Sequence, residues 1–96
     1  MIRHVVFIRF KADTPEATRA EAVDQLRDLP RKIDVVKKFD VGRNIMPAER
    51  AWDVVLIGEY DDLAALDAYD KHPAHAAVVA MMRPIAAAIG SVDYEF

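Results

Sequence analysis

The chain has no cysteine among its 96 residues. Disulfide bonds, cysteine-ligated zinc sites and thiol nucleophiles are therefore excluded. The three glycines are isolated from one another, so no glycine-rich loop is present to cradle a phosphate group. No serine stands in the Gly-x-Ser-x-Gly pattern of a hydrolase nucleophile either. These absences remove several large classes of enzyme.

The chain also lacks an excess of positive charge. It carries 13 lysines and arginines against 16 aspartates and glutamates, which gives a net charge of −3. Because binding to a phosphate backbone needs a basic surface, we expect no nucleic-acid partner. The apolar run near the start extends only from Val5 to Ile8, too short for a signal peptide or a membrane span. We therefore expect a cytoplasmic protein without a membrane partner.

Hydrophobic residues are plentiful and make up 53% of the chain. That proportion supports one folded domain over residues 1–96 and argues against general disorder. A chain of this length buries only a modest share of its surface, so a partner subunit would cover apolar surface that remains.

Alternating apolar residues predict strands over Ile2 to Phe10, Ile33 to Asn44 and Trp52 to Tyr60. In the first strand, His4 shares a face with Ile8, and in the third, Trp52 shares a face with Leu56. Between the first two strands, Thr14-Pro15-Glu16 predicts a helix start with Thr14 as the N-cap. Pro30 is expected to stop that helix.

A second helix should begin at Asp61 or Asp62 and end near His72, because Pro73 disfavours helical backbone in the residue before it. Pro73 suits the first turn of a third helix, which is expected to occupy Ala74 to Ala88 and to kink or lose regularity at Pro84. Ile89 to Phe96 reads as the last strand.

The order of these elements is that of a ferredoxin-like βαββαβ fold of the α+β class, with a four-stranded antiparallel sheet. Helices would cover one face of the sheet. The opposite face would still present four apolar side chains: Val5, Phe7, Val55 and Ile57. Because such patches usually mark an interface, we expect a homodimer that forms through the sheet faces.

Several segments resemble the stress-responsive dimeric α/β-barrel family, and the resemblance covers essentially the whole chain. They are Met-Ile-Arg-His-Val-Val at the start, residues 39–44 (FDVGRN), residues 69–75 (YDKHPAH), and Arg83-Pro84 followed by Val92-Asp93-Tyr94. The resemblance implies a homodimer in which two sheets pack face to face to form a barrel. Most members of the family have no assigned reaction.

One plant member, olivetolic acid cyclase, closes a linear polyketide by aldol condensation with a tyrosine and a histidine. On its motif, these residues match Tyr69 and His75, while His4 and His72 match histidines of the pocket wall. The cyclase has bulky aromatics in its first helix, where this chain has Ala20, Ala22 and Val23. Any pocket here would therefore be shaped for a different compound.

The chemistry of Tyr69 and His75 also favours these two residues as the candidate catalytic groups. His75 should lie in the first turn of the third helix, where exposed backbone N–H groups disfavour a positive charge and so favour the neutral ring of a general base. Tyr69 suits a hydrogen bond to a substrate carbonyl. Other interpretations stay open: both histidines of the His72-Pro73-x-His75 junction as helix caps, His4 and Tyr69 as core residues, or a metal ion held by His72, His75 and Asp70.

The sequence thus predicts a small apolar or carbonyl ligand in a pocket between sheet and helices, without cofactor or metal. Tyr69 and His75 are the candidate catalytic residues, and the candidate ligand-binding residues are His4, His72, Leu56 and Trp52. The alternatives are a cofactor-independent cyclase or isomerase that acts by enolisation, and a cofactor-free oxygenase.

Overall fold

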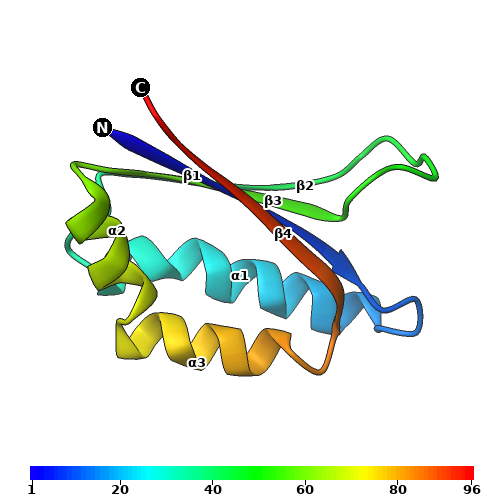
Figure 1. The fold of residues 1–96 in the computed structure, drawn as a ribbon. Helices are drawn as coiled ribbons and strands as arrows, with labels where there is room; N and C mark the ends of the chain where they lie inside the picture. The colour runs from blue at the N-terminus through cyan, green and yellow to red at the C-terminus, as the bar shows by residue number, and fades with distance from the viewer.

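A computed structural model describes residues 1–96, and the elements follow one another in the predicted βαββαβ order. They are β1 (Ile2–Phe10), α1 (Glu16–Lys32), β2 (Lys38–Arg43), β3 (Val54–Tyr60), α2 (Leu63–Asp70), α3 (Pro73–Met82) and β4 (Ala86–Glu95). The strands form one antiparallel sheet in the order β2-β3-β1-β4. All three helices lie on the same side of this sheet (Figure 1). The ferredoxin-like prediction is confirmed.

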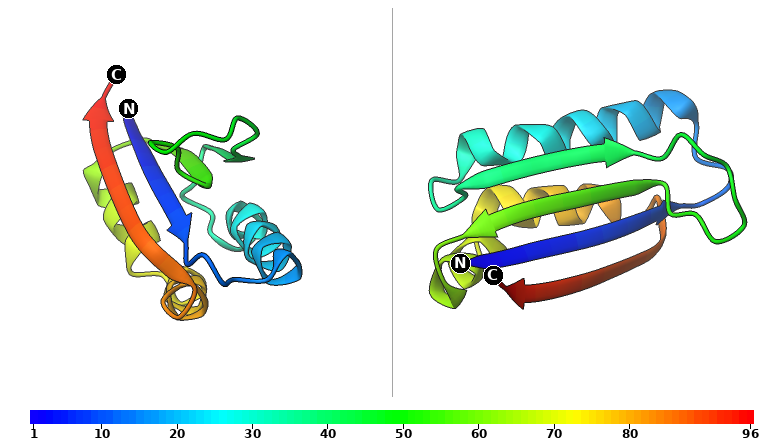
Figure 2. Two further views of the ribbon diagram at one scale, coloured as in Figure 1. Left: turned by 90° about the vertical axis from the view of Figure 1, so that its right-hand side faces the viewer. Right: turned by 90° about the horizontal axis from the view of Figure 1, so that it is seen from above.

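The sheet therefore has one covered and one uncovered face, which the end-on and top views make clear (Figure 2). The covered face carries the core, including Ile8 (3% exposed), Val54 (2%) and Leu56 (3%). On the uncovered face, Val5 pairs with Ile57 and Phe7 with Val55, and all four remain partly exposed. None of the helices has the length and apolar composition needed to cross a membrane.

The predicted break between α2 and α3 is confirmed. Asp62 is the N-cap of α2, where its side chain accepts a hydrogen bond from the backbone N–H of Ala65 at 2.8 Å. Pro73 is the first residue of α3, and His72 is its N-cap. Proline suits this position because the first helical N–H has no partner inside the helix.

The expected limits of α1 are wrong at both ends. The helix begins at Glu16 with Pro15 in the N-cap position, so Thr14 is one residue too early to be the cap. At the other end, the helix passes through Pro30 and ends at Lys32. Proline removes only one backbone hydrogen bond there, and Arg31 and Lys32 hold the last turn through ion pairs with Asp28 at 2.8 and 3.4 Å.

Three strands also begin elsewhere than expected. β2 starts at Lys38 rather than Ile33, because Ile33 is the C-cap of α1 and its side chain lies in the core, 1% exposed. β3 starts two residues after Trp52. Residues 86–88 belong to β4, not α3, because α3 ends before Pro84 and Ala86 pairs with Phe10 of β1. Here strand pairing overrides the helix propensity of alanine.

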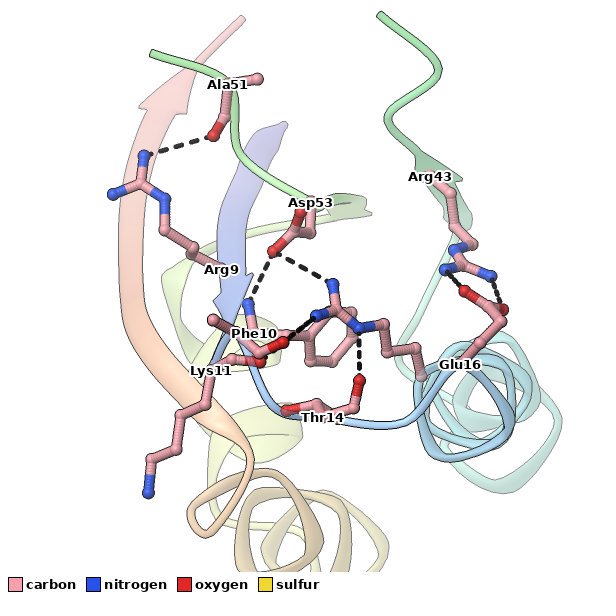
Figure 3. A network of polar contacts seen from close by, with 10 residues as sticks. Arg9, Phe10, Lys11, Thr14, Glu16, Arg43, Ala51 and Asp53 are labelled. Carbon is pink, nitrogen blue, oxygen red and sulfur yellow. Dashed lines mark hydrogen bonds and ion pairs between the residues drawn. The ribbon is translucent and has the colours of Figure 1, made fainter. Parts of the chain in front are cut away.

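A polar network holds the loop between β2 and β3 against the end of β1 (Figure 3). The carboxylate of Asp53 accepts a hydrogen bond from the backbone N–H of Phe10 at 2.7 Å, and Arg9 donates to the carbonyl of Ala51 at 3.3 Å. Beside it, Arg43 and Glu16 form a two-fold contact at 2.8 Å that links β2 to the start of α1. These contacts engage Arg9 and Arg43 at this end of the sheet.

Gly58 gives the first testable prediction. A Cβ atom at this position would lie 2.9 Å from the hydroxyl oxygen of Tyr60 and 3.0 Å from its ring, and Tyr60 is 0% exposed. We expect Gly58→Ala to lower the free energy of unfolding by about 1–3 kcal/mol, because the ring has no space to move into. Urea unfolding measures this change.

Gly42→Ala is the matched control, since a Cβ there would meet its nearest neighbour at an ordinary 3.6 Å. We expect it to change the free energy of unfolding by less than about 0.5 kcal/mol. Equal stability of the two variants would contradict the packing described for Tyr60.

Candidate functional site

A cavity of about 280 Å³ lies between the covered face of the sheet and the helices. Ten of the 14 residues that line it are hydrophobic. Its wall consists of His4, Val6 and Ile8 of β1, Leu26 and Leu29 of α1, Leu56 of β3, Tyr69 and Asp70 of α2, His75, Val78, Val79 and Met82 of α3, and Ile89 and Ser91 of β4. The cavity is thus a mostly apolar space with a few polar groups.

Four of the six residues singled out from the sequence meet at this cavity: His4, Leu56, Tyr69 and His75. The structure does not bring the other two there. The Nδ1 atom of His72 accepts a hydrogen bond from the backbone N–H of Ala74 at 3.0 Å, so this ring caps α3. This is the capping role that the sequence had left open for that histidine.

Trp52 lies on the uncovered side of the sheet. Its ring packs against Phe7, with centroids 6.0 Å apart, and the guanidinium of Arg9 stands 4.5 Å from its centroid. It lines a separate cavity of about 270 Å³ that includes Phe7, Gly42 and Val55. Trp52 and the histidines are therefore on opposite faces of the sheet.

Tyr69 occupies the centre of an aromatic cluster. Its ring centroid is 4.8 Å from that of His75, 5.2 Å from Tyr60 and 6.0 Å from His4. The residue is only 1% exposed. Burial raises the pKa of Tyr69 to about 12, with a smaller opposing effect of the Tyr60 hydroxyl. The phenol therefore stays protonated near neutral pH and can donate a hydrogen bond.

The hydroxyl of Tyr60 is buried and makes no hydrogen bond of regular geometry. Burial raises the pKa of Tyr60 too, and the hydroxyl of Tyr69 is near enough to add to the effect. The two hydroxyls thus influence each other without a well-formed hydrogen bond between them. Tyr60 does not line the cavity, but its ring packs against the ring of Tyr69.

His75 is oriented by the backbone of α2. Its Nδ1 atom lies 2.9 Å from the carbonyl oxygen of Asp70. A carbonyl oxygen only accepts hydrogen bonds, so Nδ1 must carry the hydrogen that this contact needs. In the neutral ring, Nε2 is then the atom with the free lone pair, as a general base requires.

His4 forms a side-chain pair with Asp93, which stands directly opposite in the register of β1 and β4. The contact joins Nδ1 of His4 to a carboxylate oxygen of Asp93. Sequence reasoning did not single out Asp93 as a functional residue. The strand period puts Asp93 on the same face as Ile89 and Ser91, but its position opposite His4 has no signature in the sequence.

No group of three or more histidine, cysteine, aspartate or glutamate side chains is arranged to hold a metal ion. The Nδ1 atoms of His72 and His75 are both engaged with backbone groups. The polar groups of the cavity are instead suited to hold an oxygen atom and to move a proton.

Comparison with known proteins gives a consistent picture. A curated protein of Streptomyces coelicolor, described as uncharacterised, is 33% identical over 98 residues and aligns over the full length of both chains. A dimeric protein of unknown function and ferredoxin-like fold from Bacteroides fragilis is 30% identical, with a TM-score of 0.87 over 99% of this chain and 95% of that one.

A hydroxynitrile lyase from Passiflora edulis has a TM-score of 0.85 over 97% of this chain and 90% of its own. At 18% identity, that likeness shows a shared fold alone. The family model described as the stress responsive A/B barrel domain matches residues 2–96. The chain belongs to the stress-responsive A/B barrel domain family.

Proposed function

We propose that this protein binds a small, mostly apolar carbonyl compound in the cavity between sheet and helices. The observation that carries the proposal is the meeting of Tyr69, His75 and His4 on one largely hydrophobic wall. Ligand sites typically combine such an apolar lining with a few convergent polar groups. The volume of about 280 Å³ corresponds to the space of about nine water molecules in the liquid, or a ligand of roughly ten non-hydrogen atoms.

Tyr69 is the group that would hold the carbonyl oxygen. Its hydroxyl is protonated, because burial raises its pKa to about 12, and the ring is fixed by its aromatic neighbours. A hydrogen bond from a phenol in an apolar surrounding is stronger than the same bond in water. The aliphatic part of the ligand would lie against Val78, Met82 and Leu56.

A second candidate function is enolisation of the bound carbonyl compound, as in an isomerase or polyketide cyclase. The specific observation in favour is the contact between Nδ1 of His75 and the carbonyl of Asp70, which leaves Nε2 as the basic nitrogen. His75 would take a proton from the carbon next to the carbonyl, and Tyr69 would stabilise the enolate oxygen. Such chemistry needs no cofactor.

We also propose that two copies of the chain associate through their uncovered sheet faces. Val5, Phe7, Val55 and Ile57 stand there beside Val92, which is 56% exposed. A second sheet would remove these side chains from water and complete the barrel that gives the family its name.

The site can be tested with 4-phenylbutan-2-one, a neutral ketone of about the right size. We expect the wild-type protein to bind it and to speed deuterium exchange at the carbons next to its carbonyl in D₂O, followed by NMR. Tyr69→Phe should weaken binding about three- to tenfold through the lost hydrogen bond. His75→Gln, which keeps a donor for the Asp70 carbonyl, should slow exchange about a hundredfold or more.

His72→Ala is the control, because His72 caps α3 outside the cavity. It should cost about 1 kcal/mol of stability and leave binding and exchange unchanged. If the wild-type protein binds the ketone but does not speed deuterium exchange, the proposed binding role stands and the proposed enolisation is wrong. Unchanged binding in Tyr69→Phe would contradict the assigned role of that hydroxyl.

The dimer can be tested with Val55→Asp. We expect sedimentation velocity at micromolar concentration to show a wild-type dimer and a monomeric variant, because the carboxylate would be buried without a partner. Leu63→Asp is a matched control, since Leu63 is 65% exposed at the start of α2 on the helical side. A monomeric wild-type protein under these conditions would overturn the dimer proposal.

A further inference from the structure

The permanent charge on the wall of the cavity is of one sign, which is negative. Apart from two histidines, the only ionisable groups on its wall are Tyr69 and the carboxylate Asp70, and no lysine or arginine reaches it. An adjoining opening is shared by His4, Asp70 and Asp93, and again contains no basic residue other than the histidine. A ligand that enters through this opening therefore meets carboxylates and no permanent cation.

The nearest basic residues are engaged or placed elsewhere. Lys71 follows Asp70 in the chain, but its ammonium group forms an ion pair with Asp67 at 2.9 Å. Arg83 stands after the last residue of α3 and lines a neighbouring groove, which shares Asp70 and His75 with the cavity, but Arg83 does not line the cavity itself. The groups on the wall that are able to carry positive charge are the two histidines, and His4 is already paired with Asp93.

Two buried tyrosines stand at the polar part of the cavity. Tyr69 lines the cavity and is 1% exposed, and the buried hydroxyl of Tyr60 beside it has no hydrogen-bond partner. The charge of Asp70 acts on Tyr69: after burial, Asp70 is the group that further raises the pKa of Tyr69. The negative charge of Asp70 thus acts at the Tyr69 hydroxyl, where the carbonyl oxygen of a ligand would bind.

We propose that the cavity selects uncharged ligands, and that Asp70 is the residue that excludes carboxylates and phosphates. This inference rests on the proposed function and narrows its substrate class to neutral aldehydes and ketones. An anionic ligand would bring a second negative charge close to Asp70, an exposed residue that lines the cavity, and the cavity wall offers no arginine or lysine to neutralise that charge. A neutral carbonyl meets no such repulsion and takes the hydrogen bond from Tyr69.

The test uses two probes of nearly equal shape, 4-phenylbutan-2-one and 3-phenylpropionate, which differ in that the second carries a carboxylate in place of the methyl ketone. Binding to the full-length protein is measured at neutral pH by chemical-shift changes in ¹⁵N spectra. We expect the ketone to bind at least about tenfold more tightly than the carboxylate, from repulsion by Asp70 at short range that solvent at this exposed residue screens only in part.

Asp70→Asn removes the charge and keeps the backbone carbonyl that orients His75. We expect this variant to bind 3-phenylpropionate within about threefold of the ketone, since the nearest repulsive charge is gone. Asp24→Asn, an exposed position on α1 that lines none of the described cavities, changes the net charge equally and should keep the wild-type selectivity.

The outcomes separate this inference from the proposed function. If both probes bind equally, or the carboxylate binds more tightly, the cavity binds ligands as proposed and the selection of uncharged ones is wrong. If selectivity persists in Asp70→Asn, Asp70 is not the residue responsible. If neither probe perturbs the cavity residues at millimolar concentration, the proposed function fails and this inference fails with it.

Discussion

The proline at position 73 is the constraint on which the candidate site depends. Proline disfavours helical backbone in the preceding residue, so the chain cannot continue α2 into α3 without a break. The break leaves Tyr69 in the last turn of α2 and His75 in the first turn of α3, with ring centroids 4.8 Å apart. It also turns the carbonyl of Asp70 toward His75, where it receives the Nδ1 hydrogen. A continuous helix would offer neither arrangement.

Much of this architecture could be predicted from the sequence, because the signals are local. Alternation gave β1 and its two faces, Asp62 marked the start of α2, and Pro73 marked the break. The errors fall where tertiary contacts override local preference. Pro30 was expected to end α1, but the helix continues for two more residues, Arg31 and Lys32, which form ion pairs with Asp28. The alanines at 86–88 join β4 because this segment pairs with β1.

The candidate site was predicted in part for the same reason. His4, Leu56, Tyr69 and His75 could be brought together by strand faces and a helix break. Strand alternation in the sequence puts Trp52 on the same face as Leu56. β3 begins only at Val54, however, so the alternation does not extend back to Trp52. Asp93 was missed because the register between β1 and β4 is set by long-range pairing, which leaves no mark in either strand alone.

The charge of the cavity links the fold to the proposed function. The acidic groups come from the end of α2 and from β4, while Arg9 and Arg43 at the opposite end of the sheet make contacts with Ala51 and Glu16. An apolar space with one protonated phenol, two histidines and no cation is suited to a neutral carbonyl compound.

A crystal structure of the protein with 4-phenylbutan-2-one tests this account most directly. The account predicts that the ketone lies between sheet and helices, with its oxygen in hydrogen-bond contact with the Tyr69 hydroxyl and its phenyl group against Val78 and Met82. A ketone on the uncovered face beside Trp52, or a cavity filled by a shift of Tyr69 onto Tyr60, would contradict it.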